Sequence, residues 1–234
     1  MIDFLKNNFN KERSSLLLFI FLTIDIVFIV IHLLIALFWD SNPKEFRVDE
    51  DGGYPEIFQY FKYILIVLIT FYLVAKRSIN YLPWLILFLF LCFDDALQFH
   101  EKAGIFFANF FSLQSYLGLR AIDLGELVFA FLMGLILFLF SFKSYFQGSK
   151  IFKNNCVDIL SLFTFFLFFG IGIDMVHQLF AHLEFVAGAV ALIEDGGEMI
   201  TLSLLVWYFY FIVLETDVER RFLYNYFYSK KEVK

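Results

Sequence analysis

Residues 16–38 read LLLFIFLTIDIVFIVIHLLIALF, a run of 23 residues in which only Asp25 and His32 can ionise. A secretory signal has a shorter apolar region of roughly 7–15 residues. The run ends in Phe38-Trp39-Asp40, which is not a small-residue cleavage pattern. A helix needs about 20 apolar residues to cross the hydrocarbon core of a bilayer. The run therefore predicts a first transmembrane helix that the protein retains.

Five more apolar runs along the chain reach about the same length. Their ranges are 57–76, 80–101, 120–143, 156–182 and 186–214. The runs are continuous rather than alternating, which favours helices over a membrane β-barrel. The stretch 102–119 is less hydrophobic than these runs, because it mixes Gly, Asn and Ser with Phe. We expect this stretch on the membrane surface.

The predicted fold class is all-α. We expect one membrane domain over residues 1–234, a polytopic bundle of six transmembrane helices. The tail 215–234 mixes aromatic and basic residues, and we expect it to rest on the membrane as an interfacial segment.

Composition supports a membrane protein. The chain is 61% hydrophobic and 22% aromatic, and its mean hydropathy is +0.75. A soluble domain could not bury that much apolar surface, so we expect membrane lipids as partners. With 24 acidic against 18 basic residues, the chain lacks the basic face that a nucleic-acid partner requires. Composition leaves oligomer formation open.

The placement of basic residues predicts the orientation. The N-terminal segment, the 76–79 turn, the 143–153 loop and the tail carry 3, 2, 3 and 5 basic residues. The 40–56 loop has two basic residues against six acidic ones. Cytoplasmic loops carry the excess of Lys and Arg. We therefore expect both termini in the cytoplasm.

Ionisable side chains concentrate in the last four spans. They are Asp94, Asp95, His100, Glu101, Asp123, Glu126, Asp174, His177, Glu194, Asp195 and Glu198. The third and fifth spans run outward and carry these residues at their ends, whereas the fourth and sixth run inward and carry them at their starts. At a rise of about 1.5 Å per residue, most of them lie within roughly 5–16 Å of the outer boundary. Because charges inside spans are costly and usually functional, we expect a site that faces the outer side.

Helical spacing groups some of these residues on common faces. Asp94, Gln98 and Glu101 follow an i, i+4, i+7 stripe in a continuous helix. Gly196 and Gly197 remove side chains beside neighbouring carboxylates, which lets another helix or a ligand approach closely.

The carboxylates of this layer outnumber the nearby cations, of which Lys62 and Arg120 are the closest in the predicted topology. Nine like charges at low dielectric require protons, salt bridges or metal ions. The Asp174-x-x-His177 pair is typical of metal sites in helical bundles. Imidazole mixed with carboxylate favours one or two divalent ions of zinc, iron or manganese. The predicted ligands are Asp94, Glu101, Asp123, Glu126, Asp174, His177, Glu194, Asp195 and Glu198.

Four motifs carry a resemblance. They are Tyr54-Pro55-Glu56-Ile57-Phe58-Gln59-Tyr60, the Asp94-Asp95…His100-Glu101 pattern, Asp123-Leu124-Gly125-Glu126, and Glu194-Asp195-Gly196-Gly197-Glu198-Met199. With these motifs the chain resembles a family of uncharacterised bacterial multi-pass membrane proteins. The resemblance implies a helical fold in the bacterial cytoplasmic (inner) membrane and brings no known activity.

Three functions remain open on this pattern. The first is a metal-dependent membrane enzyme, a hydrolase or oxidoreductase, acting on a lipid or small-molecule substrate at the outer leaflet. In a hydrolase the metal would activate water, Asp95 or Glu101 would act as base, and His100 is a further acid–base candidate. The second is a cation or proton transporter or channel. The third is a non-catalytic sensor or assembly subunit, in which the polar layer serves stability.

Overall fold

A computed structural model describes residues 2–38 and 43–214, so the predicted interfacial tail at 215–234 lies outside the described residues. The helices are α1 (Ile2–Phe38), α2 (Tyr54–Lys76), α3 (Leu82–Leu97), α4 (Phe99–Phe110), α5 (Ala121–Gln147), α6 (Lys150–Leu167), α7 (Asp174–Phe180) and α8 (Glu184–Leu214). Short helical segments are η1 (Lys44–Phe46), η2 (Ile79–Tyr81) and the π-helical η3 (Phe168–Ile173). Within the described ranges no β-strand is present.

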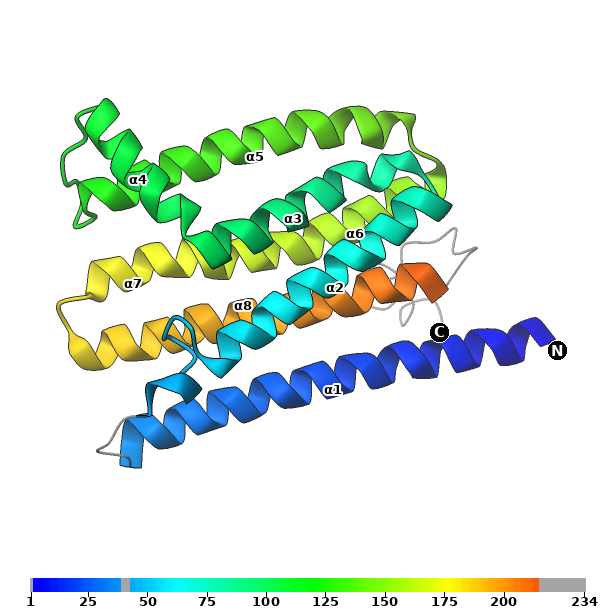
Figure 1. The fold of residues 1–234 in the computed structure, drawn as a ribbon, viewed down its shortest axis with the longest axis horizontal. Coiled ribbons are helices and arrows are strands. Elements are labelled where there is room, and N and C mark those ends of the chain that lie inside the picture. The colour runs from blue at the N-terminus through cyan, green and yellow to red at the C-terminus, as the bar shows by residue number, and fades with distance from the viewer. Residues whose placement is uncertain (1, 39–42, 215–234) are drawn as a thin grey trace, which may run out of the picture.

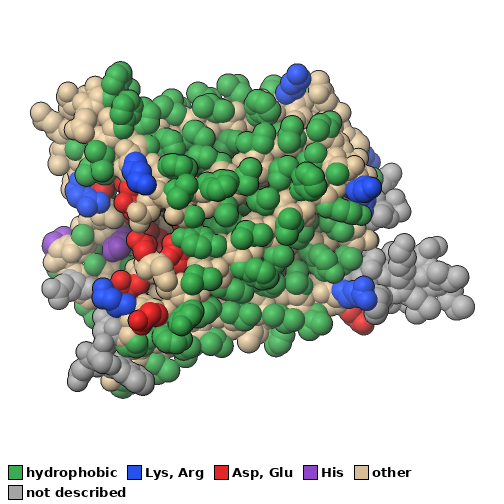
Figure 2. Space-filling view, in the orientation of Figure 1, with side chains coloured by type: hydrophobic (Ala, Val, Ile, Leu, Met, Phe, Trp, Pro, Cys, Tyr) green, Lys and Arg blue, Asp and Glu red, His purple; other side chains and the backbone are tan. Residues whose placement is uncertain are grey.

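Six helical stretches are long and apolar enough to cross a membrane. They are Glu12–Phe38, Tyr54–Lys76, Ile79–Leu97, Ala121–Gln147, Lys150–Phe180 and Phe185–Leu214. The predicted all-α bundle with six membrane-length helices is therefore confirmed. Figure 2 shows hydrophobic side chains covering the middle of one face, with charged side chains toward its two ends.

Helix α8 is the centre of the bundle. It packs against α1, α2, α6 and the η3–α7 stretch (Figure 1). Its residues Leu202, Leu205, Val206 and Phe209 are fully buried. By contrast α5 lies at the edge of the bundle and exposes most of its Phe side chains. In a membrane such a face is suited to lipid contact.

The third predicted span, 80–101, ends earlier than expected. Gln98 takes a left-handed conformation, with φ 51° and ψ 48°, and ends α3. The chain then turns into α4, so the stripe expected for Asp94, Gln98 and Glu101 does not form. Instead the Gln98 side chain donates from Nε2 to Asp51 Oδ2 at 3.1 Å.

Part of the stretch expected on the membrane surface is helix α4, which packs closely on the start of α5. The two helices cross at Gly104 and Gly125. A Cβ placed on Gly125 would lie 2.1 Å from the carbonyl oxygen of Gly104. Because the obstacle is backbone, the crossing depends on the absence of a side chain.

The fifth span contains a π-helical interruption. Six residues, Phe168–Ile173, form η3 between α6 and α7, and the whole stretch runs from Lys150 to Phe180. Single π-turns inside α-helices are rare and occur frequently at functional sites. Here η3 faces Gly197 and Glu198 of α8, since Cβ atoms on Gly197 and Gly170 would strike Phe169 and Glu198. The close approach predicted at Gly197 is thus present.

A fully buried ion pair joins three helices. Lys62 Nζ on α2 lies 2.5 Å from Asp25 Oδ1 on α1, and it also donates to the carbonyl oxygen of Met199 at 2.9 Å. Ser203 Oγ donates to Asp25 Oδ2 at 2.5 Å. Lys62, one of the two cations expected near the polar layer, is thus paired with Asp25 instead of with a carboxylate of that layer. Asp25 comes closer to Lys62 than any carboxylate of that layer, because α1 and α2 both pack on α8.

Candidate metal centre and carboxylate pocket

The ionisable residues gather at one end of the bundle, which we call the acidic end. It is formed where α1, α3 and α7 end and where α2, α5 and α8 begin (Figure 1). In Figure 2 the acidic and histidine side chains visible at this end form one group. The alternating direction of the helices brings residues from opposite ends of successive spans to one level.

Three of the predicted metal ligands form a compact group. Asp174 and His177 lie one turn apart on α7, and Glu194 lies on α8 beyond the connecting turn. His177 Nδ1 is 3.1 Å from Glu194 Oε2. One ligand atom from each residue lies within 4.8 Å of the other two. We call this group the triad.

The triad fits a divalent metal ion in both chemistry and size. Metal–ligand bonds of about 2.0–2.2 Å to imidazole and carboxylate hold ligand atoms some 3–4 Å apart, so a small side-chain movement would close the group. Gln178 Nε2 donates to Asp174 Oδ1 at 3.3 Å, which leaves the second oxygen of Asp174 without that bond. Three protein ligands would leave at least one coordination position for water or substrate.

A second pair lies where α3 turns into α4. His100 Nδ1 is 3.2 Å from Asp94 Oδ2. The hydrogen bond to Asp94 raises the pKa of His100 above its ordinary value, and burial opposes this rise only in part. The other oxygen of Asp94 is buried and has no hydrogen-bond partner in the described chain. The charges of His100 and Asp174 both act on Glu126 of α5, so this pair and the triad belong to one polar region.

Asp123 forms an ion pair with Arg120. Its carboxylate is buried and accepts from Arg120 Nη2 at 2.6 Å and from Arg120 Nε at 3.0 Å. It also accepts from the backbone N–H of Arg120 at 2.7 Å, which caps the start of α5. Arg120 thus acts as the local cation that the sequence predicts, and Asp123 holds the start of α5.

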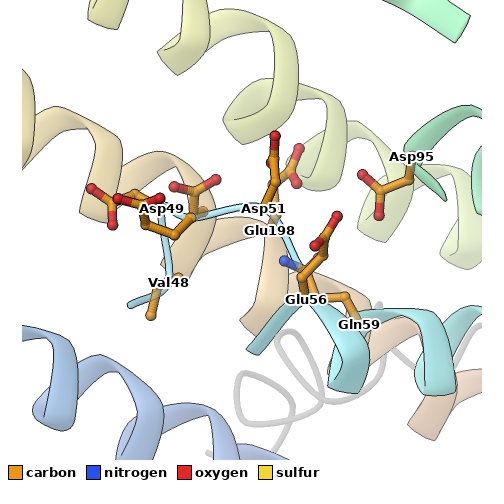
Figure 3. A pocket seen from close by; sticks show the side chains of 9 residues that line it. Val48, Asp49, Asp51, Glu56, Gln59, Asp95 and Glu198 are labelled. Atoms are coloured by element: carbon orange, nitrogen blue, oxygen red, sulfur yellow. The ribbon is translucent and has the colours of Figure 1, made fainter. Parts of the chain in front are cut away.

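A pocket of about 90 Å³ lies beside the triad, and we call it the carboxylate pocket. Its lining residues are Val48, Asp49, Glu50, Asp51, Glu56, Gln59, Asp95, Asp195 and Glu198. Figure 3 shows Asp95 and Glu56 extending toward each other from α3 and α2. No basic side chain lines the pocket.

Most of the predicted site residues thus separate into four environments. Asp174, His177 and Glu194 form the triad, Asp195 and Glu198 line the pocket with Asp95, Asp94 pairs with His100, and Asp123 pairs with Arg120. Glu126 lies near His100 and Asp174. Glu101 is exposed on α4, because the turn at Gln98 rotates it away from the face of Asp94.

Sequence reasoning missed the contribution of the loop before α2. Asp49, Glu50, Asp51 and Glu56 line the pocket, although they served only to predict orientation. Two signals pointed to them: the density of acidic residues in the loop and the motif that begins at Tyr54. Their position became evident only from the folding of the loop onto the helix ends.

Comparison with known proteins places the chain in a family. It belongs to the family described as Domain of unknown function (DUF8692), whose model matches residues 53–214. The match includes α2 to α8 and thus the triad and most of the pocket. No curated protein and no solved structure matches the chain.

Proposed function

We propose that this protein is a metal-dependent membrane enzyme whose metal centre is the triad of Asp174, His177 and Glu194. The observation that carries the proposal is the convergence of their ligand atoms within 4.8 Å of one another. A bundle that needed polar groups only for cohesion would pair carboxylates with cations, as it does at Asp25 and Asp123. Among the described residues, no Lys or Arg forms an ion pair with the triad.

The charges around the triad suit reactions that water or a base begins. A bound divalent ion would supply Lewis acidity and lower the pKa of water. Glu194 accepts from His177 and so orients the imidazole. His100, held by Asp94, is an acid–base candidate. Asp95 lines the neighbouring pocket, its carboxylate accepts no hydrogen bond from a described residue, and it is the candidate base.

The membrane setting suggests the substrate. The triad lies at the acidic end of the bundle, at a depth that a lipid headgroup or a small molecule at the membrane surface could reach. Basic residues at the opposite end, such as Lys76, Arg77, Lys143 and Lys150, support cytoplasmic termini and an outward-facing site. We propose the bacterial cytoplasmic membrane as the location, with a hydrolytic or oxidative reaction at the outer leaflet.

Metal analysis of purified protein tests the proposal. We expect about one tightly held zinc, iron or manganese ion per chain after dialysis, and its loss in the Asp174→Ala/His177→Ala double variant. Hydrolysis of a panel of lipid esters and amides should depend on the same residues and on the metal. Metal content far below one per chain, equal in the wild type and in the double variant, would reject the centre.

A cation or proton transporter is the second candidate. Buried polar groups continue from the pocket toward the middle of the bundle, since Gln59 lines the pocket and Lys62, one turn later, pairs with Asp25. A relay of this kind is common in transporters. Liposome flux assays decide this point: transport driven by an ion or pH gradient and lost in the Lys62→Met/Asp25→Leu double variant, which removes both charges together, would favour it over an enzyme. Activity in neither assay, with lowered stability on neutralising the layer, would favour a structural subunit.

A further inference from the structure

We propose that α4 and the turn after it form a lipid-docking surface, which holds a lipid of the leaflet at the acidic end beside the triad. The surface consists of Phe106 and Phe110 on α4, Phe111 directly after it, and Tyr116 and Leu117 in the turn. The contact of these side chains with lipid does not depend on the proposed function. The role of the docked lipid as the substrate of the triad rests on it.

The segment that carries this surface has no charged side chain. Residues 103–119 contain no Asp, Glu, Lys or Arg, whereas the 40–56 loop has two basic and six acidic residues. Both segments connect helices at the acidic end (Figure 1). Charged side chains almost always lie in water unless they are paired, so the composition of the 40–56 loop suits water. The composition of 103–119 suits an apolar solvent, which for a membrane protein is lipid.

The large apolar side chains of the segment project from the protein. Phe106 is 59% exposed, Phe110 68%, Tyr116 67% and Leu117 76%. Exposed apolar patches of this kind mark interaction or membrane sites. A partner protein requires a surface of complementary shape, whereas the fluid chains of a leaflet close around projecting side chains. Projection therefore favours lipid over a second copy of the chain.

Aromatic contacts join α4 to the helices of membrane length. The ring centroid of Phe107 on α4 lies 6.5 Å from that of Phe129 on α5, and Phe129 lies 6.1 Å from Phe90 on α3. Phe90 and Phe129 belong to stretches that are long and apolar enough to cross a membrane. Since α4 packs directly on α5, its exposed Phe side chains continue the lipid-facing surface of these stretches.

The turn holds Leu117 outward in an unfavourable conformation. The backbone N–H of Tyr116 donates to the carbonyl oxygen of Leu119 at 3.1 Å, and the reverse bond is 3.0 Å. Between them Leu117 and Gly118 have φ of 52° and 87°, the sign that a type I′ turn requires at both central residues. A left-handed conformation is costly for Leu, and its exposed side chain has little contact with the described chain. A leaflet around Leu117 supplies the contact that the protein does not.

The docking surface lies next to the triad. A Cβ on Gly118 would lie 3.0 Å from Cδ2 of Leu179, which is two residues after His177 on α7. The charge of Asp174 acts on Arg120, which follows the turn and precedes α5. A lipid on this surface therefore has its headgroup near the triad and its acyl chains along α4. The substrate class that fits this arrangement is a membrane lipid and not a water-soluble molecule.

Photocrosslinking of the full chain in cell membranes tests the docking. A benzophenone amino acid replaces Leu117 or Phe110 and, as the control, Glu45, which is exposed in the charged loop. After irradiation, mass spectrometry should find lipid adducts at positions 117 and 110 in several-fold excess over position 45. Adducts to a second copy or to another protein in place of lipid would overturn the docking surface. Lipid adducts no more frequent than at position 45 would overturn it as well.

A variant that preserves the turn tests delivery of the lipid to the triad. Leu117→Asn removes the apolar side chain and creates the Asn-Gly pair that a type I′ turn prefers, so its Tm in detergent should equal or exceed that of the wild type. Combined with Phe110→Ser, it should raise KM for a lipid in vesicles about tenfold, because two apolar side chains leave the leaflet. Metal content, kcat and turnover of a short-chain soluble analogue should not change.

The matched control is Ser115→Asn, which alters an exposed polar residue beside the turn and should leave KM unchanged. An unchanged KM in the Leu117→Asn/Phe110→Ser variant would overturn delivery to the triad, and so would loss of its metal, which would show a structural role. A wild type without bound metal or turnover would remove the proposed enzyme and with it the substrate role. The crosslinking result would still decide the docking surface, so the two failures are distinguishable.

Discussion

His177 Nδ1 lies 3.1 Å from Glu194 Oε2, so the end of α7 and the start of α8 face each other across the turn that joins them. This contact between a carboxylate and an imidazole joins α7 to α8 at the acidic end of the bundle. The exposed His182 lies in the turn itself and takes no part. The contact fixes the orientation of one ring nitrogen, which is the usual requirement for a histidine metal ligand.

Glu194→Gln should weaken metal binding by the triad about 10- to 100-fold or more. The amide keeps the size of the side chain and can still bond to His177, but it lacks the negative charge that a divalent ion requires. The matched comparison is Glu101→Gln, which neutralises a predicted ligand that the structure exposes on α4. Competition with a chromophoric chelator measures both affinities. Equal losses in the two variants would show that the ligands are not those of the triad.

Lys62→Met should destabilise the bundle by about 3–5 kcal/mol, since removal of one partner leaves a buried charge uncompensated. Both side chains of the Asp25–Lys62 pair are completely buried. The Lys62→Met/Asp25→Leu double variant should recover much of the loss, because replacing both partners with apolar groups is often neutral. Denaturant unfolding in detergent measures the free energies. A double variant less stable than Lys62→Met alone would contradict this account of the pair.

The stability contributed by His100 should depend on pH. Since the hydrogen bond to Asp94 raises the pKa of His100 in the folded protein, the pair stabilises the fold fully below the ordinary histidine value of about 6.5. That contribution should fall as the pH rises through the raised folded-state pKa. His100→Gln should therefore lower Tm most near pH 6 and much less near pH 9. An NMR titration of His100 provides the independent check, and Asp94→Asn should lower the pKa that it reports.

The membrane fold and the level of the polar layer could be predicted because each depends on a local property. An uninterrupted apolar run such as 16–38 is long enough to cross a bilayer whatever it packs against. Alternating helix directions then bring Asp174 and Glu194 to the same end. The position of Gly197 against Phe169 likewise followed from the absence of a side chain.

The features that were not predicted depend on tertiary packing. Gln98 adopts φ 51° although it is neither Gly nor Asn. Its side chain donates a hydrogen bond to Asp51, a residue 47 positions away. The π-helical segment η3 has no compositional signal of its own. Lys62 pairs with Asp25, and not with a carboxylate of the polar layer, because α2 and α1, which carry these two residues, both pack against α8. Each of these features depends on contacts between residues that are far apart in the sequence.

Gly125→Ala should destabilise the protein by about 1–3 kcal/mol, because the added Cβ would meet backbone atoms of Gly104 that cannot rotate away. The helices α4 and α5 would have to separate, and α4 carries His100. The matched control is Gly134→Ala in the same helix, where a Cβ would have no atom within 4 Å. That change should be neutral or stabilising by up to about 1 kcal/mol, as expected from helix propensity. Thermal and denaturant unfolding of both variants in one detergent measure the difference. Equal stability of the two variants would show that α4 does not rest on α5 at Gly125, and the placement of His100 beside Asp94 would then need another support.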